Sequence, residues 1–264
     1  MRRCYLLVLT LGMGLTWAPI VHADPHADAL LKKVIAHYKA IKSFSATLST
    51  SAIISLTKAG STTTVRFTET LKLQKPNLAY IVPAATIQVE GAGAAQAMPN
   101  PITISNGTTL WTFNKAANTY QTAKVDPEGG LIVLNSNALG VFYQPGVLLA
   151  SDVKLLNDLA PTTASSRIVG VEKVDGLSCQ VVEMRLYIIP KPDTQPLTRK
   201  MRFYIGQDNL VHRIVQDSTI PKGGSLHQEE TLTDIRINPT LPTSGFTFIP
   251  PPGAKNTTQD QSTK

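Results

Sequence analysis

The sequence LKLQKPNLAYIV, residues 71–82, joins two apolar runs through the pair Lys75-Pro76. Before the proline, leucine alternates with polar residues, which is the period of a β-strand with one buried face. A proline has no N–H to donate to a neighbouring strand, so it belongs at the start of a strand, at an edge or at a bulge. We therefore predict that the chain turns a corner at Lys75 and that Pro76 begins the next strand.

The strand before this corner is predicted from TTTVRFTETLKLQ, residues 62–74. Threonine, arginine and lysine occupy one set of alternate positions, and Glu69 interrupts the other set. Because alternate side chains of a strand point to opposite faces, one face is expected to be apolar and the other solvated. The apolar face would carry Val65, Phe67, Leu71 and Leu73.

A helix and a series of hairpins are expected around these two strands. Over residues 25–44, apolar side chains recur every three or four positions, which is the period of an amphipathic helix. After it, turn signals follow at short intervals and, with their flanking runs, predict about 11 antiparallel strands. These signals are Asn106-Gly107, residues 115–118, Asp175-Gly176 and residues 206–209.

Two further segments do not alternate. Residues 146–159 have the spacing of a helix that lies on the sheet, whereas residues 84–100 are rich in small side chains and predict a loop or a weak extra strand. Helices combined with one large antiparallel sheet place the chain in the α+β class.

The N-terminus has the pattern of an export signal. Two arginines precede an apolar run over residues 5–17, and Val21-His22-Ala23 offers small residues at the positions that a signal peptidase reads. We expect a signal peptide over residues 1–23, cleaved after Ala23, because the apolar run is too short to span a bilayer. A single domain is expected over residues 24–255, followed by a disordered polar tail over residues 256–264.

Charge and cysteine content narrow the functional classes. The net charge of +7 falls to +5 without Arg2 and Arg3, and the remaining basic residues are scattered rather than interleaved with aromatic residues. This distribution gives no support to nucleic-acid binding and favours a weak attraction to anionic membrane surfaces. Cleavage would leave Cys179 as the only cysteine, so no disulfide is expected, and its alternating apolar neighbours predict a buried strand residue.

No constellation of residues indicates catalysis. His37 is expected to be solvated on the first helix, while His212 and His227 lie in separate strands without metal-ligand spacing. Glu229 and Glu230 are neighbours on a strand, so they point to opposite faces and cannot share a proton. We therefore expect a protein that is not an enzyme, without a cofactor or a metal.

Two interpretations of the apolar strand faces remain open. A strongly curved sheet with an apolar concave face, covered by amphipathic helices, would form a cavity suited to acyl chains. The same faces could instead meet in an ordinary solid core, which has the same periodicity.

Four stretches, in this order, resemble the LolA family of bacterial periplasmic lipoprotein carriers: IKSFSATLST, LKLQKPNLAYIV, ITISNGTTLWTFNKAANTYQT and GFTFIPPPGAK. The resemblance covers most of the chain after the signal peptide. It implies an unclosed, strongly curved antiparallel β-barrel of about 11 strands, with helices forming a lid. It also implies a monomeric periplasmic carrier that shields acyl chains between an inner-membrane lipoprotein-releasing transporter and an outer-membrane acceptor. Related sheets also serve in lipid-sensing regulators of membrane stress, so a regulatory or interaction module without transport is the alternative.

The resemblance also assigns roles to individual residues. Lys75 matches an arginine that, in carriers of this family, bonds to the lid, and Ala79 stands where the family tends to have phenylalanine. Lysine lacks the planar fork of arginine, so a latch of the same geometry is not expected. Leu110 and Trp111 are neighbours on a strand, so at most one of them faces the ligand. The residues expected to bind the lipid are Val65, Phe67, Leu71, Leu73, Lys75 and Trp111.

Overall fold

The structure is a computed structural model that describes residues 24–56, 60–89, 96–97, 101–125, 165–188, 197–219 and 223–258. Three predictions fall outside these residues: the signal peptide with its cleavage site, the second helix at residues 146–159, and the last six residues of the tail.

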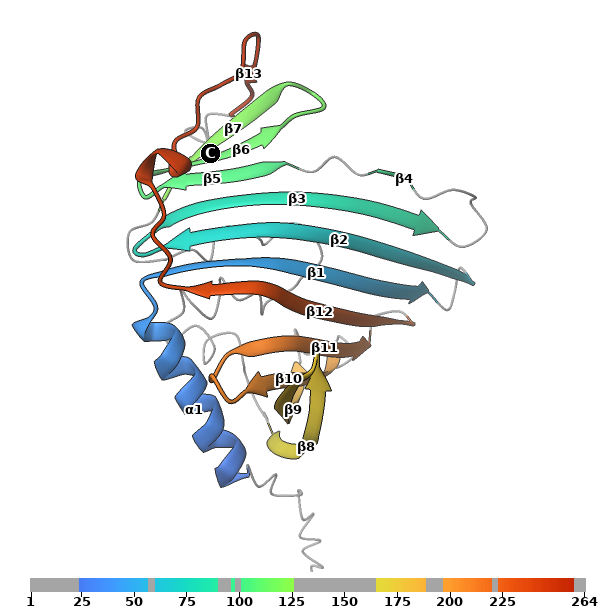
Figure 1. Cartoon of the computed structure of the whole chain (residues 1–264). Helices are drawn as coiled ribbons and strands as arrows, with labels where there is room; N and C mark the ends of the chain where they lie inside the picture. The colour runs from blue at the N-terminus through green and yellow to red at the C-terminus, as the bar shows by residue number, and fades with distance from the viewer. Residues whose placement is uncertain are drawn as a thin grey trace, which may run out of the picture.

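Within the described residues, thirteen strands form a single sheet, and two of these strands are only two residues long (Figure 1). The order of the strands is β13-β7-β6-β5-β3-β2-β1-β12-β11-β10-β9-β8, and β4 pairs with β3 outside this path. Their bounds are β1 (Ser43–Leu56), β2 (Ser61–Gln74), β3 (Leu78–Val89), β4 (Gln96–Ala97), β5 (Ile102–Asn106), β6 (Thr109–Asn114), β7 (Thr119–Lys124), β8 (Ser165–Val174), β9 (Leu177–Ile188), β10 (Leu197–Gly206), β11 (Val211–Thr219), β12 (Gly224–Ile237) and β13 (Lys255–Asn256).

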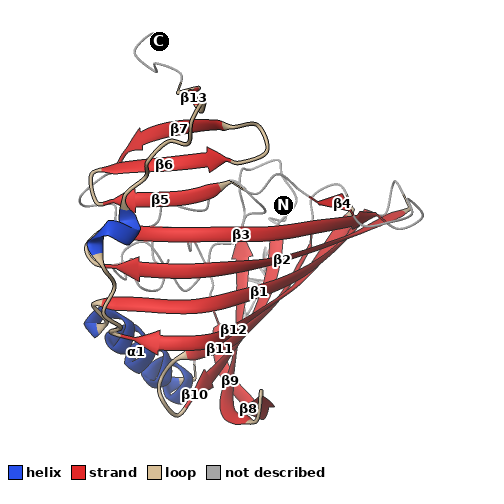
Figure 2. Ribbon diagram, turned by 45° about the horizontal axis from the view of Figure 1, so that its top comes forward, coloured by secondary structure: helices blue, strands red, loops and turns tan. Residues whose placement is uncertain are grey.

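The sheet is unclosed and strongly curved. Its path ends at β8 on one side and at β13 on the other, and β8 through β10 curl behind the broad central strands (Figures 1 and 2). All neighbouring strands on this path are antiparallel except the short pair of β13 with β7. The predicted α+β class and the unclosed, strongly curved antiparallel sheet are thus confirmed, and the eleven longer strands match the expected number.

The corner at Lys75-Pro76 exists, but Pro76 lies in the turn and β3 begins two residues later, at Leu78. The peptide bond between Lys75 and Pro76 is cis. A second proline, Pro83, lies within β3, at a point that the sequence patterns had left open. On the side away from β2, β3 pairs with β5 up to Ile81 and with β4 from Thr86 onward, so Pro83 falls where no described strand pairs with that side.

The helix α1 (Pro25–Ala40) is shorter than the predicted 25–44. Asp24 caps its N-terminus by accepting a hydrogen bond from the backbone N–H of His26 at 2.9 Å, and a proline follows in the first turn. The helix ends at Ile41, whose backbone is extended, and Phe44 is buried from strand β1 instead. The helical spacing of apolar residues continues past the end of α1 because Phe44, on β1, is buried in the same core as the apolar side of the helix.

Two boundaries differ from the sequence-based predictions. The segment 84–100, expected to be a loop or a weak strand, contributes the last six residues of β3 and the two-residue strand β4. The tail, expected to be disordered from residue 256, is paired at its start: β13 lies beside β7, and Thr257 N–H donates to the Tyr120 carbonyl at 2.8 Å. Backbone pairing at the sheet edge orders these residues despite their polar side chains.

The main apolar core lies on the concave face of the sheet. It joins residues of β2 with residues of β10, which are separated by three strands in the sheet. Side chains from strands so far apart meet only on the side toward which the sheet curves. Members of this cluster include Val34, Tyr38, Leu48, Leu71, Leu73, Met201 and Phe203.

A second, smaller cluster lies on the opposite face of β9 and β10, where the β8–β9 hairpin packs. It contains Val174, Cys179, Val181 and Tyr204. Cys179 is fully buried and not in a disulfide, as expected from its apolar neighbours, and burial raises the pKa of its thiol.

Candidate functional site

The helix α1 closes one end of the curved sheet (Figure 1). At its start, the side chain of Asp24 accepts a hydrogen bond from the backbone N–H of Ile168 on β8 at 3.1 Å. Near its end, the buried Tyr38 hydroxyl accepts a hydrogen bond from the N–H of Val211 on β11 at 3.2 Å. Burial raises the pKa of the Tyr38 phenol, so this group stays neutral. The helix is therefore tied to strands on both of its ends.

Lys75 holds the C-terminus of this helix. Its Nζ donates to the backbone carbonyls of Tyr38 at 3.1 Å and Lys39 at 2.7 Å, which are among the last carbonyls of α1. A cation is favoured there because the carbonyls carry the negative end of the helix dipole. Burial, followed by the neighbouring charge of Lys39, lowers the pKa of Lys75. The predicted partner of Lys75, a lid at residues 146–159, lies outside the described residues.

Replacing Lys75 by methionine tests this contact. We expect faster amide hydrogen exchange in the last turn of α1 and a loss of about 1–2 kcal/mol in the free energy of unfolding, because two hydrogen bonds to carbonyls are removed. Lys72→Met is the control, since Lys72 lies three residues before Lys75, on β2, with an exposed side chain. Equal exchange rates in the two variants would contradict the proposed role of Lys75.

The predicted lipid-binding residues of β2 lie on one face of the sheet, but in different surroundings. Leu71 and Leu73 are fully buried and belong to the main apolar core, which also contains side chains of α1. Val65 and Phe67 lie on the same face farther from the helix; Val65 is buried and Phe67 is half-buried.

Trp111 is not brought to this face. Strand pairing places Leu110, opposite Ser105, on the concave side, so Trp111 lies on the other side of the sheet. There its ring is 6.1 Å from that of Phe248, which also contacts Phe113 and Tyr120. The C-terminal segment thus covers Trp111 on the outer face of β6 and β7.

A gap in the wall of the sheet lies beside α1. The pairing of β11 with β12 ends at Arg213 and Thr231, so the last six residues of β12 diverge from the start of β11. Leu232 on the concave side and Thr233 next to it both border this gap. Because residues from both faces of the sheet line it, the gap connects the outer surface with the apolar core.

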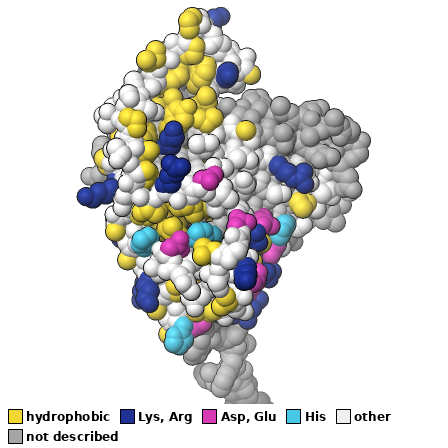
Figure 3. Space-filling model, viewed as in Figure 1, with side chains coloured by type: hydrophobic (Ala, Val, Ile, Leu, Met, Phe, Trp, Pro, Cys, Tyr) yellow, Lys and Arg dark blue, Asp and Glu magenta, His cyan; other side chains and the backbone are white. Residues whose placement is uncertain are grey.

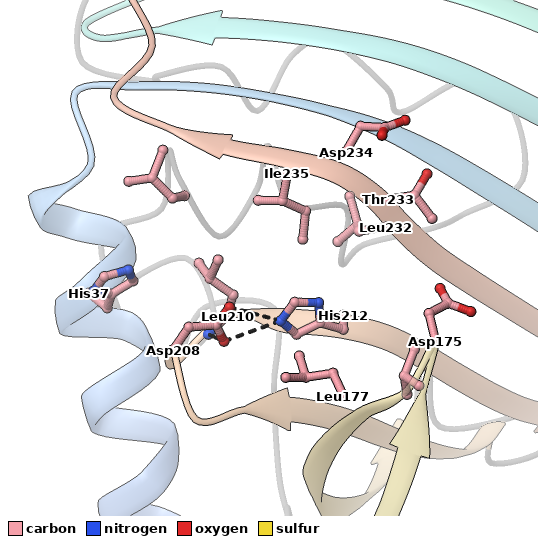
Figure 4. Close-up of a pocket in the computed structure, with 12 residues that line it drawn as sticks. His37, Asp175, Leu177, Asp208, Leu210, His212, Leu232, Thr233, Asp234 and Ile235 are labelled. Carbon is pink, nitrogen blue, oxygen red and sulfur yellow. Dashed lines mark hydrogen bonds and ion pairs between the residues drawn. The ribbon is translucent and has the colours of Figure 1, made fainter.

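The gap holds a groove with a volume of about 620 Å³, which lies within the usual size range of ligand pockets (Figure 4). Its apolar side chains come from β12, from the β10–β11 hairpin and from the β8–β9 hairpin. In the space-filling view, hydrophobic side chains reach the surface here between histidine and acidic side chains (Figure 3). The lining residues are His37, Val174, Asp175, Leu177, Asp208, Leu210, His212, Leu232, Thr233, Asp234, Ile235 and Ile237.

A histidine–aspartate pair forms the polar rim on the β10–β11 hairpin. His212 Nε2 lies 3.1 and 3.0 Å from the two carboxylate oxygens of Asp208. The ring lies directly over Gly206, where an added Cβ would come within 2.8 Å of His212 Nε2. A glycine at position 206 therefore allows this pair to fold against the hairpin. His37, expected to be simply solvated, also borders the groove.

A second feature of the concave face is polar. Beyond the apolar core, six polar side chains are buried on or beside β1, β2, β11 and β12, and we call them the polar patch. In this patch, burial raises the pKa of Glu230 to about 8, and the negative charge of the nearby Glu69 adds to the shift. Its members are Thr50, Glu69, Gln216, Ser218, Gln228 and Glu230.

Sequence reasoning missed both features. Glu69 was visible as an interruption of an apolar face, and Glu230 was correctly separated from Glu229, which lies 3.2 Å from Arg213 in an ion pair. What could not be seen is that Glu69 and Glu230 lie near each other, on two strands that both neighbour β1. The groove depends on where the pairing of β11 and β12 stops, which no local pattern signals.

The described part of the chain offers no group of three or more histidine, cysteine, aspartate or glutamate side chains that could hold a metal ion. In the same residues, no helix has both the length and the apolar character needed to cross a membrane.

Similar proteins are found at the level of family and fold. A family model described as "Predicted periplasmic protein (DUF2092)" matches residues 27–258. No curated protein is significantly similar in sequence to this chain.

Solved structures with a similar course of the chain include LprF from Mycobacterium bovis, at 15% identity and a TM-score of 0.42, covering 84% of this chain and 97% of that one. Lipoprotein LppX from Mycobacterium tuberculosis has 11% identity and a TM-score of 0.39, with 84% and 100% covered. A putative outer membrane lipoprotein-sorting protein domain from Vibrio parahaemolyticus has 10% identity and a TM-score of 0.28, with 84% and 96% covered. Scores this low carry no argument about a ligand.

Proposed function

The chain belongs to the DUF2092 family of predicted periplasmic proteins, and from this premise we propose that it is a non-enzymatic carrier of lipid in the periplasm. It would bind the acyl chains of lipids or lipoproteins and shuttle them toward the outer membrane as a monomer. A signal peptide cleaved after Ala23 would deliver it to this compartment. The transporter that loads it and the acceptor that unloads it would be membrane components on either side.

The groove between α1, β11 and β12 is the observation that supports acyl-chain binding most directly. Its walls are largely aliphatic, and Leu232 and Leu210 at its floor belong to the main core. An acyl chain entering here would exchange water for aliphatic side chains, which stabilises the complex by about 0.8 kcal/mol for each buried methylene. Micromolar binding corresponds to about 8 kcal/mol, and association costs about 4 kcal/mol or more, so about fifteen or more buried methylenes are needed.

The position of the groove also suits reversible loading. It lies at a place where two strands are not paired, so the walls can separate without breaking backbone hydrogen bonds between β11 and β12. Acidic residues and histidines occupy the rim, so the mouth remains hydrated when the groove is empty. A carrier needs such an entrance, because it must both accept and release its cargo.

The first experiment is native mass spectrometry of the mature protein purified from an envelope fraction, followed by organic extraction. Co-purified lipids or acylated peptides in a ratio of about one to one would support a carrier. A transfer assay between donor and acceptor vesicles then tests shuttling. Lipid binding without transfer, together with a stable protein partner, would instead support a lipid-sensing interaction module.

The groove itself is tested with Leu177→Gln. Leu177 lines the groove at the start of β9 and is 37% exposed, so a polar side chain is tolerated there. We expect a fluorescent fatty-acid probe to bind about tenfold more weakly, because the amide replaces aliphatic contact with the chain. Val171→Gln is the matched control, since Val171 is 62% exposed in the same hairpin and does not line the groove. Equal affinity of the two variants would rule out the groove as the acyl site.

A further inference from the structure

We infer that Thr50, Gln228 and Glu230, in the polar patch on the concave face, form a receptor for the primary ammonium group of an amphiphilic ligand. This inference rests on the proposed function, which supplies the amphiphile, and it adds the chemical class of the polar end. The acyl part would occupy the apolar groove, and the ammonium group would lie inside, at the polar patch.

Strand register brings the three side chains together on one face. Thr50 on β1 lies directly opposite Glu230 on β12, and Gln228 is two residues from Glu230 on the same strand. Directly opposed residues in an antiparallel pair have Cβ atoms about 4.5–5.5 Å apart, and positions i and i+2 point to the same face. The three side chains therefore converge on a patch only two strands wide.

Each of these side chains has an acceptor atom without a partner. Gln228 Nε2 donates to Glu230 Oε1 at 2.7 Å, which uses one end of each group. Gln228 Oε1, Glu230 Oε2 and Thr50 Oγ1 are buried and have no hydrogen-bond partner in the described chain. A buried polar atom left unpaired costs about 1–3 kcal/mol, so three such atoms on one patch favour a ligand that donates hydrogen bonds to them.

A primary ammonium group matches this arrangement in number and charge. It has three N–H donors and no acceptor, and the patch presents three unpaired acceptor atoms when the Glu230 carboxyl is ionised. Burial and the nearby charge of Glu69 hold the pKa of Glu230 at about 8, so a cation beside it would favour the ionised carboxylate. A choline group, whose nitrogen carries no hydrogen, could satisfy none of the three acceptors.

The patch adjoins the groove along β12. Leu232 lines the groove and stands two residues from Glu230 on β12, on the same face of the strand. Two residues of a strand span about 6.8 Å. An extended acyl chain covers this distance with about five methylenes. An amphiphile whose chain lies against Leu232 can therefore place its polar end at Glu230 without crossing the sheet.

The test compares two lipids that differ only in the head group. Phosphatidylethanolamine and phosphatidylcholine with identical acyl chains are presented in mixed detergent micelles, and binding to the mature protein is measured by native mass spectrometry. We expect the ethanolamine lipid to bind about tenfold more tightly. In Glu230→Gln this ratio should fall toward one, because an amide binds a cation more weakly than a carboxylate does.

Glu229→Gln is the matched control, because Glu229 lies next to Glu230 but points to the outer face, where it pairs with Arg213. This variant should keep the tenfold ratio. Equal binding of the two lipids to the wild type would overturn the inference and leave acyl-chain binding intact. Absence of binding for both lipids would overturn the proposed function and the inference together. A preference for ethanolamine that survives in Glu230→Gln would place the ammonium site elsewhere and also overturn the inference.

Discussion

Leu71→Ala should lower the free energy of unfolding by about 2–5 kcal/mol, the usual cost of removing a leucine side chain from a packed core. Leu71 is 2% exposed and belongs to the cluster that joins α1 to the concave face of the sheet. Truncation leaves a cavity that α1 and the strands, tied together by hydrogen bonds at both ends of the helix, can fill only in part.

Urea unfolding, followed by circular dichroism, measures this effect. Lys72→Ala is the control, because Lys72 is the next residue on β2 and its side chain is exposed on the outer face. Its cost should stay below about 0.5 kcal/mol. A loss below 1 kcal/mol for Leu71→Ala would mean that the space beneath α1 is open, as in a cavity, and not packed.

The same burial changes the choice of variants for ligand studies. An arginine at position 71 could be expected, from the sequence alone, to occupy an open cavity and block the ligand in a folded protein. In the structure it would place an unpaired charge within the core, so we expect the protein to unfold. Residues at the rim of the groove, such as Leu177, are the suitable positions instead.

Glu230→Gln should stabilise the protein progressively as the pH rises from about 5 to about 8. The pKa of Glu230 is raised from its ordinary 4.5 to about 8 in the folded state. A carboxyl group with a raised folded pKa binds its proton more tightly when folded, so its contribution to stability is complete below pH 4.5 and is lost as the pH rises through 8. Glutamine resembles the neutral acid in shape and cannot lose a proton.

The measurement is the difference in unfolding free energy between Glu230→Gln and the wild type at several pH values. This difference should grow by up to about 1.4 kcal/mol per pH unit over that range, since one proton is involved. Glu229→Gln, on the outer face of the same strand, is the control for the effect of an added amide on β12. A flat difference for Glu230→Gln would show that the carboxyl group is already ionised in the folded protein.

Much of the fold could be predicted from local patterns. The alternation in residues 62–74 places Val65, Leu71 and Leu73 on one face, and the structure buries all three. The corner at Lys75 and the hairpin at Asp175-Gly176 also occur where turn residues predicted them. These features depend on residues close in sequence, whose side-chain period and backbone preferences are set locally.

The site was predicted less well. The alternation of side chains along a strand shows which residues share a face, but it does not show which face is concave or what covers that face. Trp111 was expected to bind the ligand, yet pairing places it on the outer face against Phe248. The resemblance pairs Lys75 with a lid that lies outside the described residues, and within them Lys75 caps α1. In both cases the deciding contact comes from a segment distant in sequence.

The amino-acid sequence alone thus determined the class of the fold, the face that each β2 side chain occupies and the absence of any motif for catalysis. Only the tertiary structure decided that Leu71 shares a core with α1, that β12 leaves β11 at Thr231 to open a groove, and that Thr50 and Glu230 lie side by side. The physical reason is the distance along the chain over which each effect acts. Periodicity and turn preferences act over a few residues, whereas burial, strand register and the field of a neighbouring carboxylate arise between residues almost 200 positions apart.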